Sequence, residues 1–201
     1  MPRVSRQQTE QNRAAIEEAS ARLFREQGIH GVSVADLMAA AGLTHGGFYG
    51  HFESKDALAA TACSKAFALS SERWRQRIAD AGDPRAALRL IIEAFLGPRA
   101  RDNPGNSCPA ASLVTDVARE ARGKPVRQSY VDGIQELISI LAELQASGDA
   151  EADRDRALAQ FSTMVGALLI ARATAPDPVS DRILAAARRH LLSDGDSLPH
   201  P

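Results

Sequence analysis

The sequence predicts an all-α protein with about nine helices, in which an N-terminal three-helix helix-turn-helix domain is joined to a larger helical domain. Alanine, leucine, arginine and glutamate, which favour helices, dominate the 201 residues. Apolar residues recur at the spacing of one helix face, and no run of β-branched residues marks a strand. Hydrophobic residues make up 44% of the chain, which is enough to bury a core without disulfides.

The first predicted helix covers residues 10–27. A polar arm, residues 1–10, precedes it and carries Arg3 and Arg6, which we expect to add contacts to a nucleic acid if this end binds one. Gly28 is expected to end the helix, because glycine readily adopts the left-handed conformation that follows many helix C-termini.

Two short helices joined by a tight turn come next. Ser33 is expected to cap the first of them, with Asp36 as the acidic partner of a capping box. Gly42 ends that helix, and Thr44 is expected to cap the second, which reaches about residue 51. A helix this short is unstable alone, so its neighbours must hold it and leave its outer face free.

Glycines and prolines divide the rest of the chain. The segment 97–107 is expected to be irregular, and the remaining helices are predicted at residues 54–78, 84–96, 109–122, 125–146, 153–173 and 178–192. The resulting domains are a head of residues 1–60 with its helix-turn-helix at about 33–52, a body of residues 61–192 and a disordered tail of residues 193–201.

The second short helix is unusual because it contains Gly46, Gly47 and Gly50. Each glycine in a helix costs roughly 0.5–1 kcal/mol relative to alanine. One explanation is close approach of the bare backbone to a phosphate or a base edge. The alternative is that Phe48 and Phe52, one helical turn apart, anchor the helix well enough to tolerate poor helix formers.

Polar residues around this helix are candidates for phosphate contacts. Tyr49 lies off the Phe48–Phe52 face, and His51 and Lys55 follow it; the alternatives are a half-buried tyrosine, an idle histidine and a solvated lysine. Lys55 falls in the first turn of a helix, where the dipole disfavours a cation unless an anion is near. Ser33 and Thr44 mark helix N-termini, which also bind phosphate.

A set of residues between positions 9 and 60 forms one specific pattern: Phe24 to Gly28, Val34, Leu37, Ala41-Gly42-Leu43-Thr44, Phe48-Tyr49-Gly50-His51-Phe52 and Ser54-Lys55-Asp56-Ala57-Leu58. This pattern resembles the DNA-binding domain of the TetR family of bacterial regulators. The resemblance covers about a quarter of the chain and is only architectural beyond residue 60.

The resemblance implies a homodimer whose two heads contact successive major grooves of a palindromic operator on double-stranded DNA. It implies a regulator, by family default a repressor, that a small-molecule effector releases from DNA; a redox signal is the alternative that Cys108 suggests. It carries over DNA contacts to Thr44, His45, Gly46, Gly47, Tyr49, His51 and Lys55. Ser33, at a helix N-terminus that can bind phosphate, completes the set of candidate DNA contacts.

The resemblance also implies that the last two helices form the dimer interface. The residues expected there are Phe161, Met164, Val165, Leu168, Leu169, Ile183, Leu184, Ala187 and Leu191, and the alternative is that they form an intramolecular core. Candidate effector contacts are apolar or aromatic residues of the middle helices: Phe67, Trp74, Leu88, Ile92, Phe95, Leu113, Val117, Tyr130 and Phe161. Each of these is also consistent with ordinary core packing.

Cys108 is a candidate redox switch because it immediately precedes Pro109 at the expected start of a helix. A helix N-terminus lowers the pKa of a thiol and raises its reactivity. The alternative is an unreactive, small apolar residue, and Cys63 is expected to be inert.

Charge and motifs constrain the function further. The net charge is −1, and residues 1–60 hold six Lys and Arg against seven Asp and Glu, so DNA binding would depend on the placement of charge. No catalytic or metal-binding motif is found, so an enzyme is disfavoured and no cofactor or metal is expected. A helical interaction module without DNA is the third alternative. No signal peptide or membrane span is recognised, which predicts a cytoplasmic protein without membrane contact.

Overall fold

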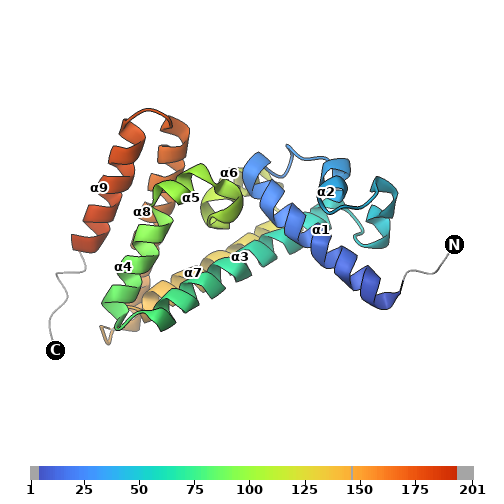
Figure 1. The fold of residues 1–201 in the computed structure, drawn as a ribbon. Coiled ribbons are helices and arrows are strands. Elements are labelled where there is room, and N and C mark those ends of the chain that lie inside the picture. Colours follow the sequence, from blue (N-terminus) through green and yellow to red (C-terminus); the bar gives the residue numbers. More distant parts are fainter. Residues whose placement is uncertain (1–4, 146, 194–201) are drawn as a thin grey trace.

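The computed structural model describes residues 5–145 and 147–193, and all regular structure within these ranges is helical, which confirms the predicted fold class (Figure 1). The elements are α1 (Arg6–Gln27), α2 (Val34–Ala40), the 3₁₀ helix η1 (His45–Gly50), α3 (Lys55–Asp80), α4 (Pro84–Phe95), α5 (Pro98–Asp102), η2 (Pro104–Asn106), α6 (Pro109–Arg119), α7 (Pro125–Glu143), α8 (Ala150–Thr174) and α9 (Val179–Ser193).

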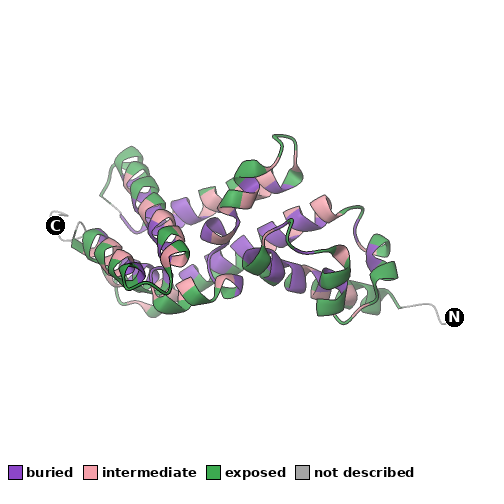
Figure 2. Cartoon of the chain, turned by 90° about the horizontal axis from the view of Figure 1, so that it is seen from above, coloured by how far each residue is buried: buried purple, intermediate pink, exposed green. Residues whose placement is uncertain are grey.

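The long helix α3 connects the two ends of the molecule. At one end α1 packs against its N-terminal half, with α2 and η1 beside α1 (Figure 1). Helix α7 lies along α3, and the antiparallel pair α8 and α9 packs with α4 at the other end. Buried residues lie on the sides of the helices that face one another, and the outer sides and most connecting loops are exposed (Figure 2).

The packing of α3 against α7 depends on one glycine. A Cβ atom placed on Gly133 would lie 2.1 Å from Cγ of Phe67, far closer than non-bonded carbon atoms approach. Phe67 is buried, and its ring also contacts Tyr130 edge-on with a centroid distance of 5.5 Å. The absence of a side chain at Gly133 therefore allows α3 and α7 to pack in direct contact at this point.

The predicted helix ends of the head are largely confirmed. Gly28 and Gly42 have φ values of 80° and 73°, in the left-handed region that glycine favours. Ser33 accepts a hydrogen bond from the Asp36 backbone at 3.2 Å, and Asp36 accepts one from the Ser33 backbone at 2.9 Å, which completes the capping box. Thr44 occupies the cap position of η1, but its side chain makes no capping bond, so that expectation was wrong.

Two further boundary predictions were wrong. Helix α1 begins at Arg6 because Ser5 caps it, and Arg6 pairs with Glu10 at 3.0 Å, so residues 6–10 are helical and not an arm. The segment 97–107 contains α5 and η2, since Pro98 and Pro104 suit the first position of a helix. Arg3 and residues 194–201 of the predicted tail lie outside the described residues.

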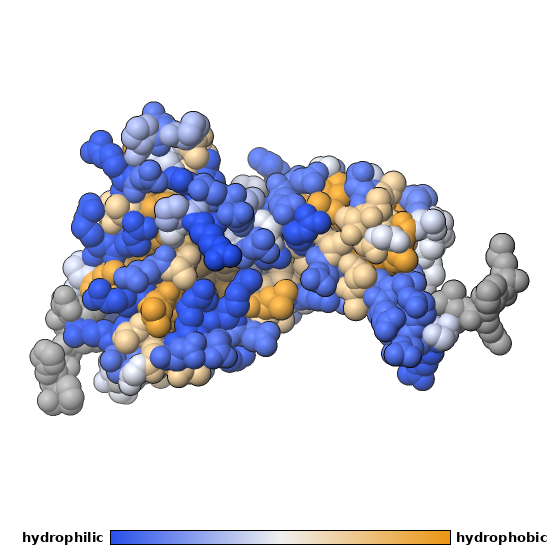
Figure 3. All heavy atoms as spheres, in the orientation of Figure 1, coloured by the Kyte–Doolittle hydropathy of each residue, from blue (hydrophilic) through white to orange (hydrophobic). Residues whose placement is uncertain are grey.

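By length and composition alone, α8 could span a membrane, and 39% of its most apolar window is buried in this fold. It packs between α7 and α9, as a core helix does, and a single such helix is weak evidence for a membrane segment. On the face of the molecule drawn in Figure 3, hydrophobic atoms form separate patches among hydrophilic ones.

Candidate nucleic-acid interface

The core of the head holds η1 in place through two aromatic side chains. Phe48 is completely buried, Phe52 is 4% exposed, and their rings stack with a centroid distance of 6.0 Å. The predicted Phe48–Phe52 anchor is therefore confirmed. Because η1 is a six-residue 3₁₀ helix and not the α-helix that was predicted, these contacts must supply most of its stability.

Arg13 of α1 fixes the end of η1, and sequence reasoning missed it. Its Nη1 donates a hydrogen bond to the His51 carbonyl at 2.6 Å, and its guanidinium lies 4.3 Å from the centre of the Phe52 ring. Glu17 pairs with its Nε at 3.1 Å and so orients it. No local signal distinguishes this arginine from the others on the polar face of α1.

The outer face of η1 is exposed. Tyr49 is 73% exposed although its ring contacts Phe48 edge-on, and Thr44 and His45 beside it are exposed as well. None of these three side chains makes a hydrogen bond to another residue in the described part of the chain. Their polar groups are therefore available to an external partner.

His51 and Lys55 lie beside this face and are half-buried. Nδ1 of His51 is buried without a hydrogen-bond partner, and Lys55, in the first turn of α3, pairs with none of the described carboxylates. A cation near a helix N-terminus is unfavourable unless an anion offsets it. The surroundings of Lys55 thus agree with a nearby phosphate.

Fold geometry does not require the three glycines of η1. A Cβ atom on Gly46 or Gly50 would meet nothing within 4 Å, and one on Gly47 would be 3.6 Å from Cε of Met38, an ordinary contact. Their φ values lie outside the left-handed region. Neither packing nor backbone conformation requires glycine at these positions. The Phe48–Phe52 anchor is consistent with a helix that tolerates poor helix formers, and close approach of a partner to the backbone stays a prediction.

Ser33 differs from the other candidates because its polar groups are occupied. Its hydroxyl donates to Asp36 at 2.5 Å and accepts from the Asp36 backbone. The side-chain and backbone hydrogen bonds of Ser33 lower the pKa of Asp36, so a carboxylate already occupies the N-terminus of α2. An external phosphate would meet this negative charge, and the structure therefore gives Ser33 a structural role.

The predicted effector contacts are divided between two cavities and the core. Trp74 and Phe95 line a cavity between α3, α4 and the α5–η2 segment, and Phe67 lines another between α3 and α7. The other predicted residues line neither cavity. Five of them are buried in the core: Leu88, Ile92, Leu113, Val117 and Phe161. Tyr130 is half-buried and packs against that core. Tyr130 donates its hydroxyl hydrogen to the Ala110 carbonyl at 2.7 Å.

The lowered thiol pKa that was predicted for Cys108 is wrong. The residue is 7% exposed, and burial raises the pKa of its thiol to about 11 despite its position before α6. Desolvation of the thiolate thus outweighs the hydrogen bonds and nearby positive charges that favour it. Burial also raises the pKa of Cys63 to about 12, as expected of an inert thiol.

More than half of the predicted dimer residues belong to the core of one chain. The completely or almost completely buried ones are Phe161, Met164, Leu168, Leu184 and Leu191. Val165, Leu169, Ile183 and Ala187 remain partly exposed on α8 and α9. The exposed apolar residues of these helices also include Leu158, Ile170 and Val179, and Ile170 is 55% exposed.

Comparison with known proteins gives concordant matches. Residues 16–62 match the sequence profile of bacterial regulatory proteins of the tetR family. The chain is similar to the HTH-type transcriptional repressor DhaR of Mycobacterium sp. (strain GP1), with 30% identity over 144 residues, covering 66% of this chain and 71% of that protein. It is also similar to the HTH-type transcriptional regulator AcrR of Shigella flexneri, with 31% identity over 97 residues, or 46% of this chain. That match spans only 43% of the AcrR sequence.

Solved structures share the whole fold. The crystal structure of a TetR transcriptional regulator from Chloroflexus aurantiacus J-10-fl superposes with a TM-score of 0.77 and 25% sequence identity. The superposition covers 95% of this chain and 97% of that one. The resemblance seen in the head therefore extends to the arrangement of the body.

Proposed function

The chain belongs to the TetR family of bacterial transcriptional regulators, and from this premise we propose that it is a repressor that a small molecule releases from a palindromic operator. Residues 1–60 act as the DNA-binding head and residues 61–192 as the effector-binding and dimerisation body. The proposed DNA contacts are Thr44, His45, Gly46, Gly47, Tyr49, His51 and Lys55, and Ser33 is excluded from them because Asp36 occupies its hydroxyl.

The observation that carries this proposal is the outer face of η1. It combines a tyrosine that is 73% exposed with two successive glycines, Gly46 and Gly47, that neither packing nor φ requires. In a helix-turn-helix, this face lies in the major groove, where a backbone without Cβ atoms approaches phosphates or base edges closely. Because only His45 offers a long side chain at the reading positions, we expect few direct base contacts and a large share of backbone contacts.

We propose that two copies pair through the partly exposed apolar residues of α8 and α9, with Ile170 among them. Pairing would place two η1 faces on one side of the dimer, as a palindromic site requires. An effector would act by binding more tightly to the dimer conformation that does not fit the operator than to the conformation that does.

The test is a mobility-shift titration with DNA from upstream of the gene for this protein. The parent protein should bind, and its affinity should fall steeply with salt because phosphate contacts release counterions. A His45→Ala/Tyr49→Ala double variant should bind about tenfold or more weakly at an unchanged melting temperature, as loss of one or two charge-assisted or groove contacts predicts.

Arg89→Ala is the matched control. Arg89 is exposed on α4, at the opposite end of the molecule from η1, so its removal changes charge without touching the η1 face. Failure of the parent protein to bind the fragment at low salt contradicts the proposed function. Equal affinities for the parent and the double variant contradict the assignment of η1 as the reading element.

A further inference from the structure

A cavity of about 610 Å³ lies between α3, α4 and the α5–η2 segment. Its volume falls within the range of small-molecule sites, roughly 300–1,000 Å³. One part of the wall is apolar and contains Trp74, Phe95 and Leu168, with the rings of Trp74 and Phe95 6.4 Å apart. The wall therefore suits a ligand with an apolar, ring-like body.

The rest of the wall is strongly basic. Arg73, Arg77 and Arg99 line it, against one carboxylate, Glu93. None of the three arginines lies within ion-pair distance of a carboxylate in the described residues. Among the described residues, Arg73 donates only to Ser70 Oγ at 3.2 Å, and Arg77 only to the Arg73 carbonyl at 3.1 Å. Most of their guanidinium donors are therefore free to bind a ligand.

Two further arginines bind Ser107, a residue that lines this cavity. Nη1 of Arg25 donates to the Ser107 carbonyl at 2.8 Å, and Arg172 donates to the Ser107 hydroxyl. Burial, and then repulsion from Arg73, lowers the pKa of Arg25 to about 10, and the same two causes lower the pKa of Arg77. The region thus carries an excess of positive charge that a bound anion would offset.

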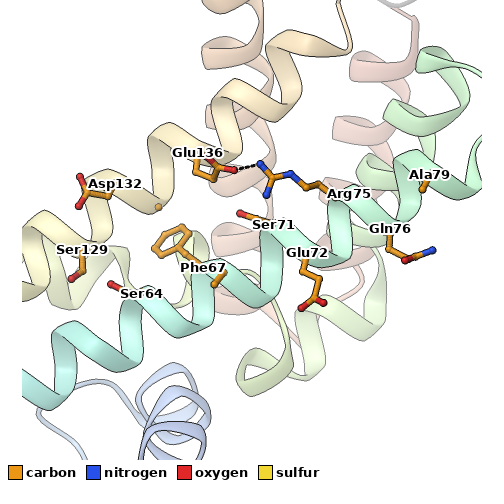
Figure 4. Close-up of a pocket in the computed structure, with 12 residues that line it drawn as sticks. Ser64, Phe67, Ser71, Glu72, Arg75, Gln76, Ala79, Ser129, Asp132 and Glu136 are labelled. Atoms are coloured by element: carbon orange, nitrogen blue, oxygen red, sulfur yellow. Dashed lines mark hydrogen bonds and ion pairs between the residues drawn. The ribbon is translucent and has the colours of Figure 1, made fainter. Parts of the chain in front are cut away.

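A second cavity, of about 680 Å³ between α3 and α7, has the opposite character. It is lined by Glu72, Asp132 and Glu136 and by one arginine, Arg75, which pairs with Glu136 (Figure 4). Its charge repels anions, although its apolar base includes the ring of Phe67. The two cavities are similar in size, so charge distinguishes the ligands that each accepts.

We propose that the cavity lined by Arg73, Arg77 and Arg99 binds an organic anion, with the acidic group on these guanidinium groups and the apolar body against Trp74 and Phe95. This inference rests on the proposed function, since it names the chemical class of the effector. Arginine is suited to this role because its planar donors bind carboxylate, sulfonate or phosphate oxygens in pairs.

The test uses two fluorescent probes of the same shape that differ in charge. One is 8-anilinonaphthalene-1-sulfonate, and the other is the uncharged N-phenyl-1-naphthylamine. The full-length protein should bind the sulfonate saturably and the neutral probe at least about tenfold more weakly, because a charge-assisted hydrogen bond is worth about that factor or more. Arg77→Gln and Arg99→Gln should each weaken sulfonate binding about tenfold and leave binding of the neutral probe unchanged.

Arg75→Gln is the control, because Arg75 is exposed on the same helix but lines the acidic cavity. It should leave sulfonate binding unchanged, and circular dichroism of every variant should match the parent. The proposal is overturned by absence of saturable sulfonate binding, by equal affinity for the neutral probe, or by indifference to both Arg77→Gln and Arg99→Gln.

The titration contains no DNA, so its result is independent of the proposed function. A parent protein that binds the sulfonate through these arginines but never binds DNA contradicts the regulator and leaves the anion site standing. A parent protein that binds DNA but not the sulfonate contradicts the anion site alone.

Discussion

The outer face of η1 and the seam between α3 and α7 use glycine in opposite ways. At the seam, a Cβ atom on Gly133 would lie 2.1 Å from Phe67, so the fold requires glycine there. On η1, a Cβ atom on Gly46 would meet nothing within 4 Å, so the isolated chain has no need of glycine. A residue without a structural role on an exposed face is a better guide to function than a residue that packing explains.

The largest effect should follow from Gly133→Ala. The added methyl group forces apart α3 and α7 or displaces the Phe67 ring, and overpacking of this kind costs about 1–3 kcal/mol. The better helix propensity of alanine offsets only about 0.5–1 kcal/mol of this overpacking cost. Urea denaturation should show a lower midpoint at an unchanged slope. An equal or higher midpoint would mean that the seam has room that the structure does not show.

The same substitution on η1 should have the reverse profile. Gly46→Ala should leave the free energy of unfolding within about 0.5 kcal/mol of the parent, as for other surface changes, because the methyl group enters open space. Its affinity for operator DNA should fall about tenfold, or about 1.4 kcal/mol, if the backbone at Gly46 approaches the duplex closely. Unchanged DNA affinity would remove the functional explanation of the η1 glycines.

The smallest effect concerns Cys108, which should be nearly inert in the folded protein. Since burial raises the pKa of its thiol to about 11, the thiol is protonated at neutral pH, and its thiolate fraction grows only as the pH approaches that value. Iodoacetamide should label neither cysteine appreciably at pH 7 in the native state and both in urea. Rapid native labelling of Cys108, followed by mass spectrometry, would restore the redox switch.

Helix positions were predictable from sequence because they depend on local signals. The capping box of Ser33 and Asp36 and the left-handed glycines Gly28 and Gly42 were all placed correctly. Prediction failed where a proline admits two outcomes: Pro98 and Pro104 suggested irregular chain but begin short helices. The head was also recognisable because a whole set of residues between Phe24 and Leu58 matches one family pattern.

The partner of an apolar helix face was not predictable from sequence. Periodicity identifies the apolar side of α8, but not whether it faces the same chain or a second copy, and Met164 and Leu168 proved to be completely buried within one chain. The burial of Cys108 and the reach of Arg13 to the His51 carbonyl likewise depend on tertiary contacts. For the same reason, sequence reasoning did not predict that Arg73, Arg77 and Arg99 would gather around one cavity.

The contact between Phe67 and Gly133 also determines which parts of this molecule can move. A slide of α7 along α3 by one helical turn would bring Ser129 or Leu137 over the ring in place of the glycine, and neither fits in that space. This contact therefore opposes a sliding movement of α7 along α3, and we expect the two helices to move as one unit. Beside this pair, α6 and the residue after it join the head through polar contacts: the Ile29 amide donates to Asp116 at 3.0 Å, and His30 contacts Glu120 at 2.7 Å.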